Sequence, residues 1–444
     1  MVNGKLQMGG KLHKSSFQLV TALYFLTIAI GLLPCRPSFA SDVYLGLQAY
    51  GAGGKQLGVG LAPFTSPPGD SESANLAQSI RSVMREDLLF EHLFNVVEGG
   101  PAATDKLDSL AWNGLAAQVV IGGIVKVQGS QVDLQCQIYD VSTGKVLFGK
   151  EGSGPKSNAR RLAHLMSDQM TFQLSGQPGI AHTRIVFVNN STKHKEVYVM
   201  DYDGANPRQL TYHHSIDLLP KYSPDGKTIA FNSYRAGNPD AYLMDANGGD
   251  LRELSTRQGL NTAPGWSPDG QTLALTLSRG GDPELYLMDR SGRIIRRLTH
   301  TPGVDTSPSF SPNGQQIAFI SDRSGNPELY VMDVTGGNVQ RLTYGEWVDA
   351  PAWSPKGDWI VYERQRAQAQ FDIYVIEPSG RNNHVVSEAG SRNENPTWSP
   401  DGRFLTISSD RDGRNKICVM LADGTSPHCV SELPGESFTP SWGP

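Results

Sequence analysis

The sequence lacks the short motifs that mark most catalytic and nucleotide-binding sites. It contains no Gly-x-Ser-x-Gly elbow, no His-Glu-x-x-His and no Cys-x-x-Cys, which are the patterns of serine hydrolases, zinc peptidases and redox or zinc sites. Gly51-Ala-Gly-Gly-Lys55 has neither the spacing nor the hydroxyl of a phosphate-binding loop. We therefore expect no catalytic residue, no metal site and no cofactor.

Two patterns come close to a metal site without completing one. Asp201-Tyr-Asp-Gly204 resembles the start of a calcium loop, but the later acidic ligands are missing, which favours a turn. His164 and Asp168 lie one turn apart on a predicted helix and could hold a metal or relay a proton. We favour the alternative, a role on the helix face or at a domain interface.

Long apolar runs are absent after the N-terminal region. There, a basic start precedes an apolar run over residues 17–33, and Ser38-Phe39-Ala40 has the small-x-small pattern of a cleavage site. We expect residues 1–40 to be a secretory signal, cleaved between Ala40 and Ser41. A retained anchor or a lipidated Cys35 fits less well, because a proline follows the run and directly precedes the cysteine.

An excess of positive charge is also missing. The predicted signal removes four cations and leaves 35 Lys and Arg against 44 Asp and Glu, a net charge of −9. Proteins that bind nucleic acids mainly through phosphates carry basic surfaces, so this balance argues against a nucleic-acid binder. The remaining 404 residues are enough for two domains with separate cores.

A pentapeptide recurs at a nearly fixed interval in the second half of the chain. Its serines stand at 223, 267, 311, 354 and 399, so successive copies lie 43 to 45 residues apart. This is the period of a β-propeller blade rather than of a helical solenoid. Proline presets a turn, and glycine supplies the positive φ that ends it. The copies are Tyr222–Gly226, Trp266–Gly270, Phe310–Gly314, Trp353–Gly357 and Trp398–Gly402.

Each repeat predicts one blade. Residues 305–343 read as four short strands separated by clusters of Gly, Pro, Asn and Asp. The aromatic residue before each turn is large enough to fill the wedge between neighbouring blades. For Trp266, Trp353 and Trp398 we favour this packing role over an exposed function.

The two ends of the array predict how the ring closes. Residues 184–188 match a second strand with no first strand before them, and residues 439–443 match a first strand. Trp442 follows Trp398 by 44 residues, which is the repeat period. The C-terminal strand therefore completes the first blade, which gives an all-β propeller of six blades over residues 184–444 with no free sheet edge.

Few cysteines remain after the signal. Cys418 and Cys429 fall on the predicted third and fourth strands of the last blade. The sequence leaves open whether they form a disulfide in an oxidising compartment or remain two buried thiols. We expect Cys136 to be a buried strand residue.

Residues 41–176 do not repeat and mix strand and helix periodicities, which predicts a small N-terminal mixed α/β domain. Residues 177–183, rich in Gly and Pro, read as the linker to the propeller. We expect strands at 42–47, 57–64, 95–97, 119–127, 132–139 and 145–148, and helices at 71–89, 105–116 and 159–174.

Several segments of the first domain are specific. Trp112-Asn-Gly-Leu-Ala116, Tyr139-Asp-Val-Ser-Thr-Gly144 and Arg160-Arg-Leu-Ala-His164 occur in this order, and Thr183-Arg-Ile-Val-Phe187 follows at the junction. With these segments ahead of the propeller repeats, the chain resembles the TolB family of Tol–Pal systems over essentially all of its mature length. The repeats alone would be less specific, because peptidase propellers share them.

The resemblance implies binding rather than catalysis. TolB-like propellers dock the peptidoglycan-associated lipoprotein Pal, and the mature N-terminus binds the inner-membrane protein TolA. The resemblance thus implies a non-enzymatic, monomeric adaptor of the periplasm, peripheral to the outer membrane through Pal. Such an adaptor supports outer-membrane integrity and invagination during cell division.

The implied Pal-binding face carries the loops that lead into the first strand of each blade. Ala263 and Thr306 align with positions that the family uses for Pal, whereas Leu260 replaces a polar residue of familiar relatives. The alternative is that these loops are only turns. The expected face consists of Asp217, Leu260, Asn261, Thr262, Ala263, Asp305, Thr306, Asp349, Asn393 and Ser437.

The implied TolA-binding segment is the mature N-terminus. A short alternating segment at a free end can add as a strand to a partner's sheet. The alternative is that it forms the first strand of its own domain. The segment consists of Ser41, Asp42, Val43, Tyr44, Leu45, Gly46 and Leu47.

Two rival functions remain. A propeller-containing, peptidase-like hydrolase would need an α/β-hydrolase domain with Ser, Asp and His, and the first domain is too short for one. A sugar- or metal-binding propeller would need matched acidic or aromatic residues around its channel, and the loops described above do not match one another.

Overall fold

The computed structural model describes residues 56–103, 106–367, 370–387 and 390–444. The predicted signal, its cleavage site and the expected TolA-binding segment lie outside the described residues. Within the described part of the chain, no helix has the length and apolar character needed to cross a membrane.

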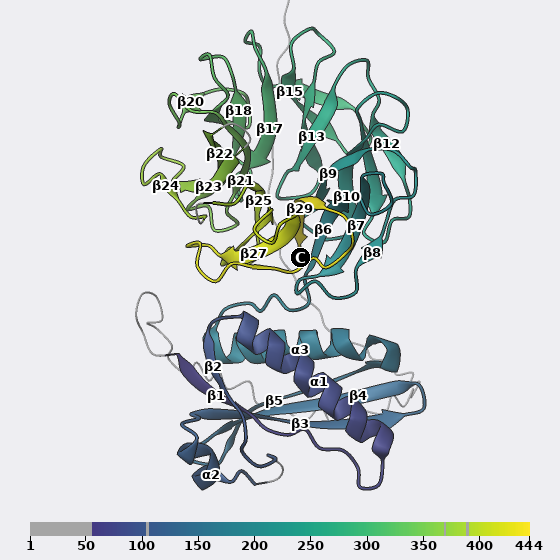
Figure 1. Ribbon diagram of the computed structural model, residues 1–444, viewed down its shortest axis with the longest axis vertical. Coiled ribbons are helices and arrows are strands. Elements are labelled where there is room, and N and C mark those ends of the chain that lie inside the picture. Colours follow the sequence, from purple (N-terminus) through teal and green to yellow (C-terminus); the bar gives the residue numbers. More distant parts are fainter. Residues whose placement is uncertain (1–55, 104–105, 368–369, 388–389) are drawn as a thin grey trace, which may run out of the picture. The chain divides into compact units, whose positions relative to one another are not determined.

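The first domain is a five-stranded sheet packed against helices (Figure 1). Its strand order is β2-β1-β3-β4-β5. Strand β1 is parallel to its neighbours β2 and β3, whereas β4 is antiparallel to its neighbours β3 and β5. The elements are β1 (Leu57–Leu61), α1 (Ser71–Phe90), β2 (Phe94–Val97), α2 (Ser109–Gly114), β3 (Val119–Gln128), β4 (Gln131–Asp140), β5 (Val146–Pro155), the 3-10 turn η1 (Lys156–Asn158) and α3 (Ala159–Ser175).

Local chemistry explains the long helices. The carboxylate of Asp70 accepts a hydrogen bond from the Ser73 amide at 3.0 Å and so caps the start of α1. Apolar residues of α1 at helical spacing, such as Ile80, Met84 and Leu88, are buried in the core of the sheet. Helix α3 ends at Gly176, whose φ of 70° is the left-handed conformation that commonly terminates helices.

Two predicted boundaries in this domain are wrong. The predicted helix over residues 105–116 is only Ser109–Gly114, because Asp108 caps it late through the Ala111 amide and Ala116 turns to a φ of 62°. The predicted strand over residues 145–148 continues to Pro155, since β4 offers it an unbroken pairing partner back to Gln131. The buried Cys136 lies on β4 as expected and has a free thiol.

The propeller consists of six four-stranded antiparallel sheets (Figure 1). The inner strands are β9 (Asp217–Tyr222), β13 (Asn261–Trp266), β17 (Asp305–Phe310), β21 (Val348–Trp353), β25 (Asn393–Trp398) and β29 (Ser437–Gly443). The second strands are β10 (Thr228–Ser233), β14 (Thr272–Leu277), β18 (Gln316–Ser321), β22 (Ile360–Ala367), β26 (Phe404–Ser409) and β6 (Arg184–Asn189).

The fourth and outermost strand of each blade is the shortest. The third strands are β11 (Asp240–Asp245), β15 (Glu284–Asp289), β19 (Glu328–Asp333), β23 (Gln370–Ile376), β27 (Lys416–Leu421) and β7 (Glu196–Asp201). The fourth strands are β12 (Arg252–Ser255), β16 (Ile294–Arg297), β20 (Gln340–Arg341), β24 (His384–Val385), β28 (His428–Cys429) and β8 (Arg208–Gln209).

The C-terminal strand closes the ring, as predicted. Strand β29, yellow in Figure 1, pairs with β6 from Ser437 opposite Asn189 to Gly443 opposite Arg184. The order β29-β6-β7-β8 therefore completes a blade from the two ends of the propeller sequence. Strand β6 is thereby paired on both sides. The expectation of a ring with no free sheet edge is wrong, because each blade is a separate sheet whose inner and outer strands are paired on one side only.

The recurrent aromatic residues pack between blades, which confirms their predicted role. Trp266 is 9% exposed and shares a core cluster with Leu243 of the preceding blade and Leu275 of its own. Its indole nitrogen donates to the Lys221 carbonyl of the preceding inner strand at 3.1 Å. Trp398 does the same to the Ala352 carbonyl at 3.0 Å, so these two indoles join neighbouring blades by contact and by hydrogen bond. The indole of Trp353 packs in the same way but donates to the Gly357 carbonyl of its own turn.

Asp168 and His164 of α3 have structural partners. Asp168 accepts from the amide of Ala181 at 2.8 Å and from the ring of His182 at 2.6 Å, which fixes the segment before β6. Nδ1 of His164 lies 2.8 Å from a carboxylate oxygen of Asp87, and the Tyr202 hydroxyl donates to that oxygen at 2.7 Å. These contacts support the interface role that we favoured for the two residues.

Cys418 and Cys429 form a disulfide. They lie directly opposite each other on β27 and β28, with their Cα atoms 3.7 Å apart. Of the two alternatives that the sequence left open, a disulfide or two buried thiols, the structure has the disulfide. The bond ties the short outer strand of the last blade to its neighbour.

We expect the double variant Cys418→Ser, Cys429→Ser to lose stability. The bond closes a loop with a sequence separation of 11 residues, and a loop of that size stabilises by about 2–3 kcal/mol through the unfolded chain. Urea unfolding followed by tryptophan fluorescence measures the loss. A reductant should bring the wild type to the level of the variant and leave the variant unchanged. Equal stability of both proteins in oxidising buffer would contradict the prediction.

Candidate partner-binding mouth of the propeller channel

The same backbone distortion occurs in all six inner strands. The third residue of each strand has a left-handed φ between 45° and 55°, although none is glycine. This conformation costs roughly 1 kcal/mol or more for a residue with a Cβ atom, and it persists only where the surroundings enforce it. We call these six the mouth residues: Leu219, Ala263, Ser307, Ala350, Asn395 and Thr439.

A proline after each mouth residue explains the distortion. Proline has no amide hydrogen, so it cannot take its place in a regular ladder and is tolerated at a bulge. The pairing register breaks at this point, for example between Thr262 and Gly265 and between Thr306 and Ser309. The six prolines are Pro220, Pro264, Pro308, Pro351, Pro396 and Pro440.

Side chains of neighbouring strands hold the bulges in place. The amide of Ala263 donates to the side chain of Asn232 at 3.0 Å, and the amide of Asn395 donates to Glu363 at 2.6 Å. Asn232 and Glu363 belong to the preceding blades and are almost fully buried. Each of these hydrogen bonds therefore links two blades and makes the mouth rigid.

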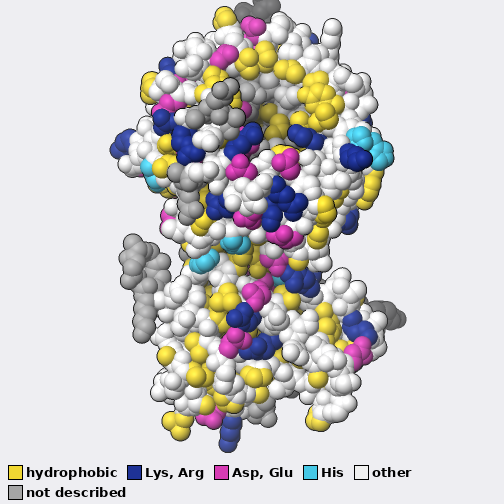
Figure 2. Space-filling view, viewed as in Figure 1, with side chains coloured by type: hydrophobic (Ala, Val, Ile, Leu, Met, Phe, Trp, Pro, Cys, Tyr) yellow, Lys and Arg dark blue, Asp and Glu magenta, His cyan; other side chains and the backbone are white. Residues whose placement is uncertain are grey.

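The mouth residues surround a cavity of about 230 Å³. All six inner strands contribute to its lining, which mixes methyl groups, proline rings and hydroxyls with the carboxylate of Asp349. Ser307 donates to that carboxylate at 2.9 Å. In the space-filling view the propeller is hollowed at its centre, and hydrophobic side chains line the hollow (Figure 2).

Four of the ten residues predicted for the Pal-binding face lie at this mouth, and a fifth, Leu260, lies in the loop that leads into one of its strands. Thr262, Ala263, Thr306 and Asp349 line the cavity. Leu260 precedes the inner strand of the same blade as Ala263 and is 37% exposed. These five are half-buried or exposed and available to a partner.

The other five predicted residues are buried at the first position of their strands, and four of them hold the loops through hydrogen bonds. Arg323 donates to both oxygens of Asp305, at 2.9 and 3.0 Å. Asn261 donates to the Arg257 carbonyl at 2.6 Å. The Asp217 carboxylate is equally buried but has no hydrogen-bond partner among the described residues. The five are Asp217, Asn261, Asp305, Asn393 and Ser437, all at most 2% exposed.

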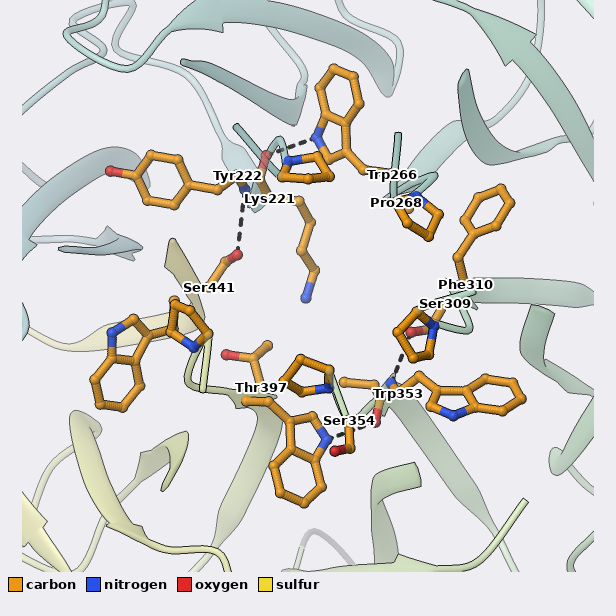
Figure 3. A pocket seen from close by; sticks show the side chains of 18 of the residues that line it. Lys221, Tyr222, Trp266, Pro268, Ser309, Phe310, Trp353, Ser354, Thr397 and Ser441 are labelled. Atoms are coloured by element: carbon orange, nitrogen blue, oxygen red, sulfur yellow. Dashed lines mark hydrogen bonds between the residues drawn. The ribbon is translucent and has the colours of Figure 1, made fainter. Parts of the chain in front are cut away.

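The sequence prediction missed most of the mouth residues. The available signal was a proline two positions before the aromatic of each repeat, since the mouth residue directly precedes this proline. It also missed Lys221, the fifth residue of β9, whose side chain points into the channel (Figure 3). The equivalent positions hold small or hydroxylated residues: Gly265, Ser309, Ala352, Thr397 and Ser441.

Two carboxyl groups meet beside the mouth. Asp349 and Glu363 are paired across β21 and β22. Burial raises the pKa of both groups, and the neighbouring Asp349 carboxylate adds to the rise for Glu363, whose pKa reaches about 8. Glu363 is therefore mostly protonated at neutral pH and accepts the Asn395 amide as a neutral group.

The described residues offer no set of three His, Cys, Asp or Glu side chains arranged to bind a metal ion. Asp201-Tyr-Asp-Gly204 forms a turn in which the Gly204 amide donates to the Asp201 carbonyl at 2.9 Å. The observed chemistry of the mouth is that of a rigid, concave contact surface.

Comparisons with known families match both parts of the chain. The family model described as the TolB amino-terminal domain matches residues 48–147, and the one described as the TolB beta propeller domain matches residues 172–444. A crystal structure of TolB from Acinetobacter baumannii is similar with a TM-score of 0.77 and 26% identity, covering 88% of this chain and 97% of that one.

Relatives in sequence are similar over part of their length. A "Protein TolB homolog" from Chlorobium chlorochromatii is 35% identical over 230 residues, which cover 50% of this chain and 51% of the relative. A "Tol-Pal system protein TolB" from Desulfosudis oleivorans is 34% identical over 223 residues, which cover 48% and 51%. The chain spans about half the length of the curated relatives it matches.

The buried Glu363 predicts a pH dependence of stability. Its pKa in the folded protein, about 8, exceeds its ordinary value of 4.5, so its contribution is fully present below pH 4.5 and is lost as the pH rises to about 8. Glu363→Gln keeps an acceptor for the Asn395 amide but cannot ionise. Between about pH 5 and pH 8 the wild type should lose roughly 2–4 kcal/mol of unfolding free energy relative to the variant.

Urea unfolding of both proteins across this pH range makes the measurement. Glu253→Gln, which removes an exposed carboxylate of the same propeller, should keep the wild-type profile. Parallel profiles for the wild type and Glu363→Gln would show that the buried carboxyl does not set the pH dependence.

Proposed function

This chain belongs to the TolB family, whose propeller model alone matches residues 172–444, and we propose that it is a non-enzymatic periplasmic adaptor of a Tol–Pal system. In this proposal the channel mouth docks the lipoprotein Pal, and the mature N-terminus, residues 41–47, binds TolA. The adaptor would thereby support outer-membrane integrity and invagination at cell division. The names of the relatives support membership of such a system.

The repeated strain at the mouth is the observation that carries the proposal for Pal. All six blades keep a non-glycine residue in the left-handed conformation at this one level. Strain of this kind is typically concentrated at binding and switching sites, where the fold over-determines the geometry. A costly feature that all six blades share around one opening favours a shared role in recognition.

The mouth has the properties of a binding hot spot. Small side chains such as those of Ala263, Ser307 and Ala350 let a partner approach the backbone closely. Hydroxyls of Thr262 and Thr306 stand among proline rings, so an inserted side chain would meet both apolar surface and hydrogen-bonding groups. Because interblade hydrogen bonds hold the bulges at Ala263 and Asn395, this part of the mouth would lose little conformational entropy on binding.

The N-terminal segment has weaker support. Its alternating residues suit addition to a partner's sheet, and the proposal otherwise depends on family membership. The peptidase-like alternative has less support than the adaptor, because the matched relatives are named for TolB and the sequence has no Gly-x-Ser-x-Gly motif.

Calorimetric titration with the soluble domain of Pal from the same organism tests the docking proposal. We expect a Kd of about 1 µM or tighter for the wild type. In the double variant Ala263→Arg, Thr306→Arg two bulky cations would fill the mouth cavity, and affinity should fall by about a hundredfold or more. Circular dichroism checks that the variant is folded.

The matched control adds the same two cations elsewhere on the same two blades. Ser291→Arg, Thr335→Arg places them on exposed turns between the third and fourth strands and should leave the affinity unchanged. Equal weakening by both double variants would point to charge rather than to the mouth. No binding by the wild type would remove the docking proposal and leave the family assignment intact.

A further inference from the structure

A second cavity continues the channel beyond the mouth. It has a volume of about 440 Å³, and its lining comes from the Ser-Pro turns of five blades and the wedge aromatics of all six. Lys221 lines both this cavity and the mouth cavity. Its side chain therefore lies where the two cavities meet.

Lys221 carries the one charged side chain in the lining of the larger cavity. The rest of that lining consists of Pro, aromatic, Gly, Ala, Ser and Thr residues. Figure 3 shows the lysine stem extending from β9 toward the middle of the ring, with its nitrogen at the open end. The mouth lining holds one other charged residue, Asp349, and it does not contribute to the lowered pKa of the lysine.

Among the described residues, no side chain or carbonyl forms an ion pair or a hydrogen bond with the Lys221 ammonium. Burial alone lowers its pKa, to about 8, so the group is mostly charged at neutral pH. A cation that is held in a confined, weakly polar space without a counter-charge is unfavourable. An anion that entered the channel would relieve this cost.

Hydroxyl groups at three other positions around the channel complete the site (Figure 3). Thr397 is 7% exposed, and its hydroxyl has no hydrogen-bond partner among the described residues. The Ser309 hydroxyl accepts from the Trp353 amide at 3.0 Å, and the Ser441 hydroxyl accepts from the Tyr222 amide at 3.4 Å. Their own hydrogens remain available to a ligand (Figure 3).

From this arrangement we infer that the channel is a carboxylate-binding site. The Lys221 ammonium pairs with the carboxylate, and the hydroxyls of Ser309, Thr397 and Ser441 donate to its oxygens. One cation without an arginine fork matches a singly charged group better than a phosphate. The carboxylate comes either from an acidic side chain of a docked protein or from a free small molecule. The inference does not depend on Pal.

Succinate titrated into the purified protein by calorimetry tests the site. We expect millimolar binding to the wild type and at least tenfold weaker binding to Lys221→Met, while uncharged succinamide does not bind. Lys227→Met removes an exposed lysine on the adjacent turn and should bind like the wild type. Absence of succinate binding to the wild type, or equal binding to Lys221→Met, would overturn the inference.

A second variant guards against a folding defect. Thr397→Val keeps the volume of the side chain and removes only its hydroxyl, so succinate binding should weaken several-fold. If Lys221→Met does not fold, as judged by circular dichroism, an unchanged affinity of Thr397→Val overturns the site, and a several-fold loss supports it.

Titration with the Pal domain distinguishes the two sources. If Lys221→Met weakens Pal binding at least tenfold and succinate competes with Pal, an acidic side chain of the partner supplies the carboxylate. If Pal binding is unaffected by Lys221→Met while succinate still binds, the ligand is a free small carboxylate. If Pal does not bind at all, the docking proposal fails, and the succinate result alone decides on the site.

Discussion

The pairing of β29 with β6 is the constraint on which the rest of the propeller depends. It brings the sixth inner strand into the ring and places Thr439 and Ser441 among the residues that line the two cavities. It also seats Trp442, whose indole donates to Thr183 at 2.8 Å beside the start of β6. Without this pairing the channel would have five walls, and neither the mouth nor the lysine site would be enclosed.

Much of the fold could be predicted because it follows from local turn chemistry repeated at a fixed period. The Ser-Pro turns, together with the incomplete blades at the two ends of the array, were enough to predict the number of blades and the closure of the ring. Strand β5 was predicted too short because Gly149, Gly152 and Gly154 interrupt its pattern and only its pairing with β4 defines it. The disulfide depended on a register that spacing alone does not fix.

The candidate site was harder to predict, since residue type does not report backbone conformation or burial. Polar residues such as Asp305 and Asn261 look like surface loop residues in sequence, yet they are buried inside the blades. Leu219 and Thr439 are poor candidates for a left-handed conformation by residue type, yet both adopt it in the folded ring. Most specific chemistry of the channel lies where one blade departs from the repeat, as at Lys221 and Glu363.

Ring closure also has a consequence for how the propeller folds. The contact between Asn189 and Ser437 spans 248 residues, so the first blade cannot form until the last inner strand is available. Contacts of such long range slow folding, because much of the chain must be organised before they form. During synthesis β6 would thus be an exposed, apolar sheet edge for longer than any other strand, and it is the segment that a chaperone would need to protect.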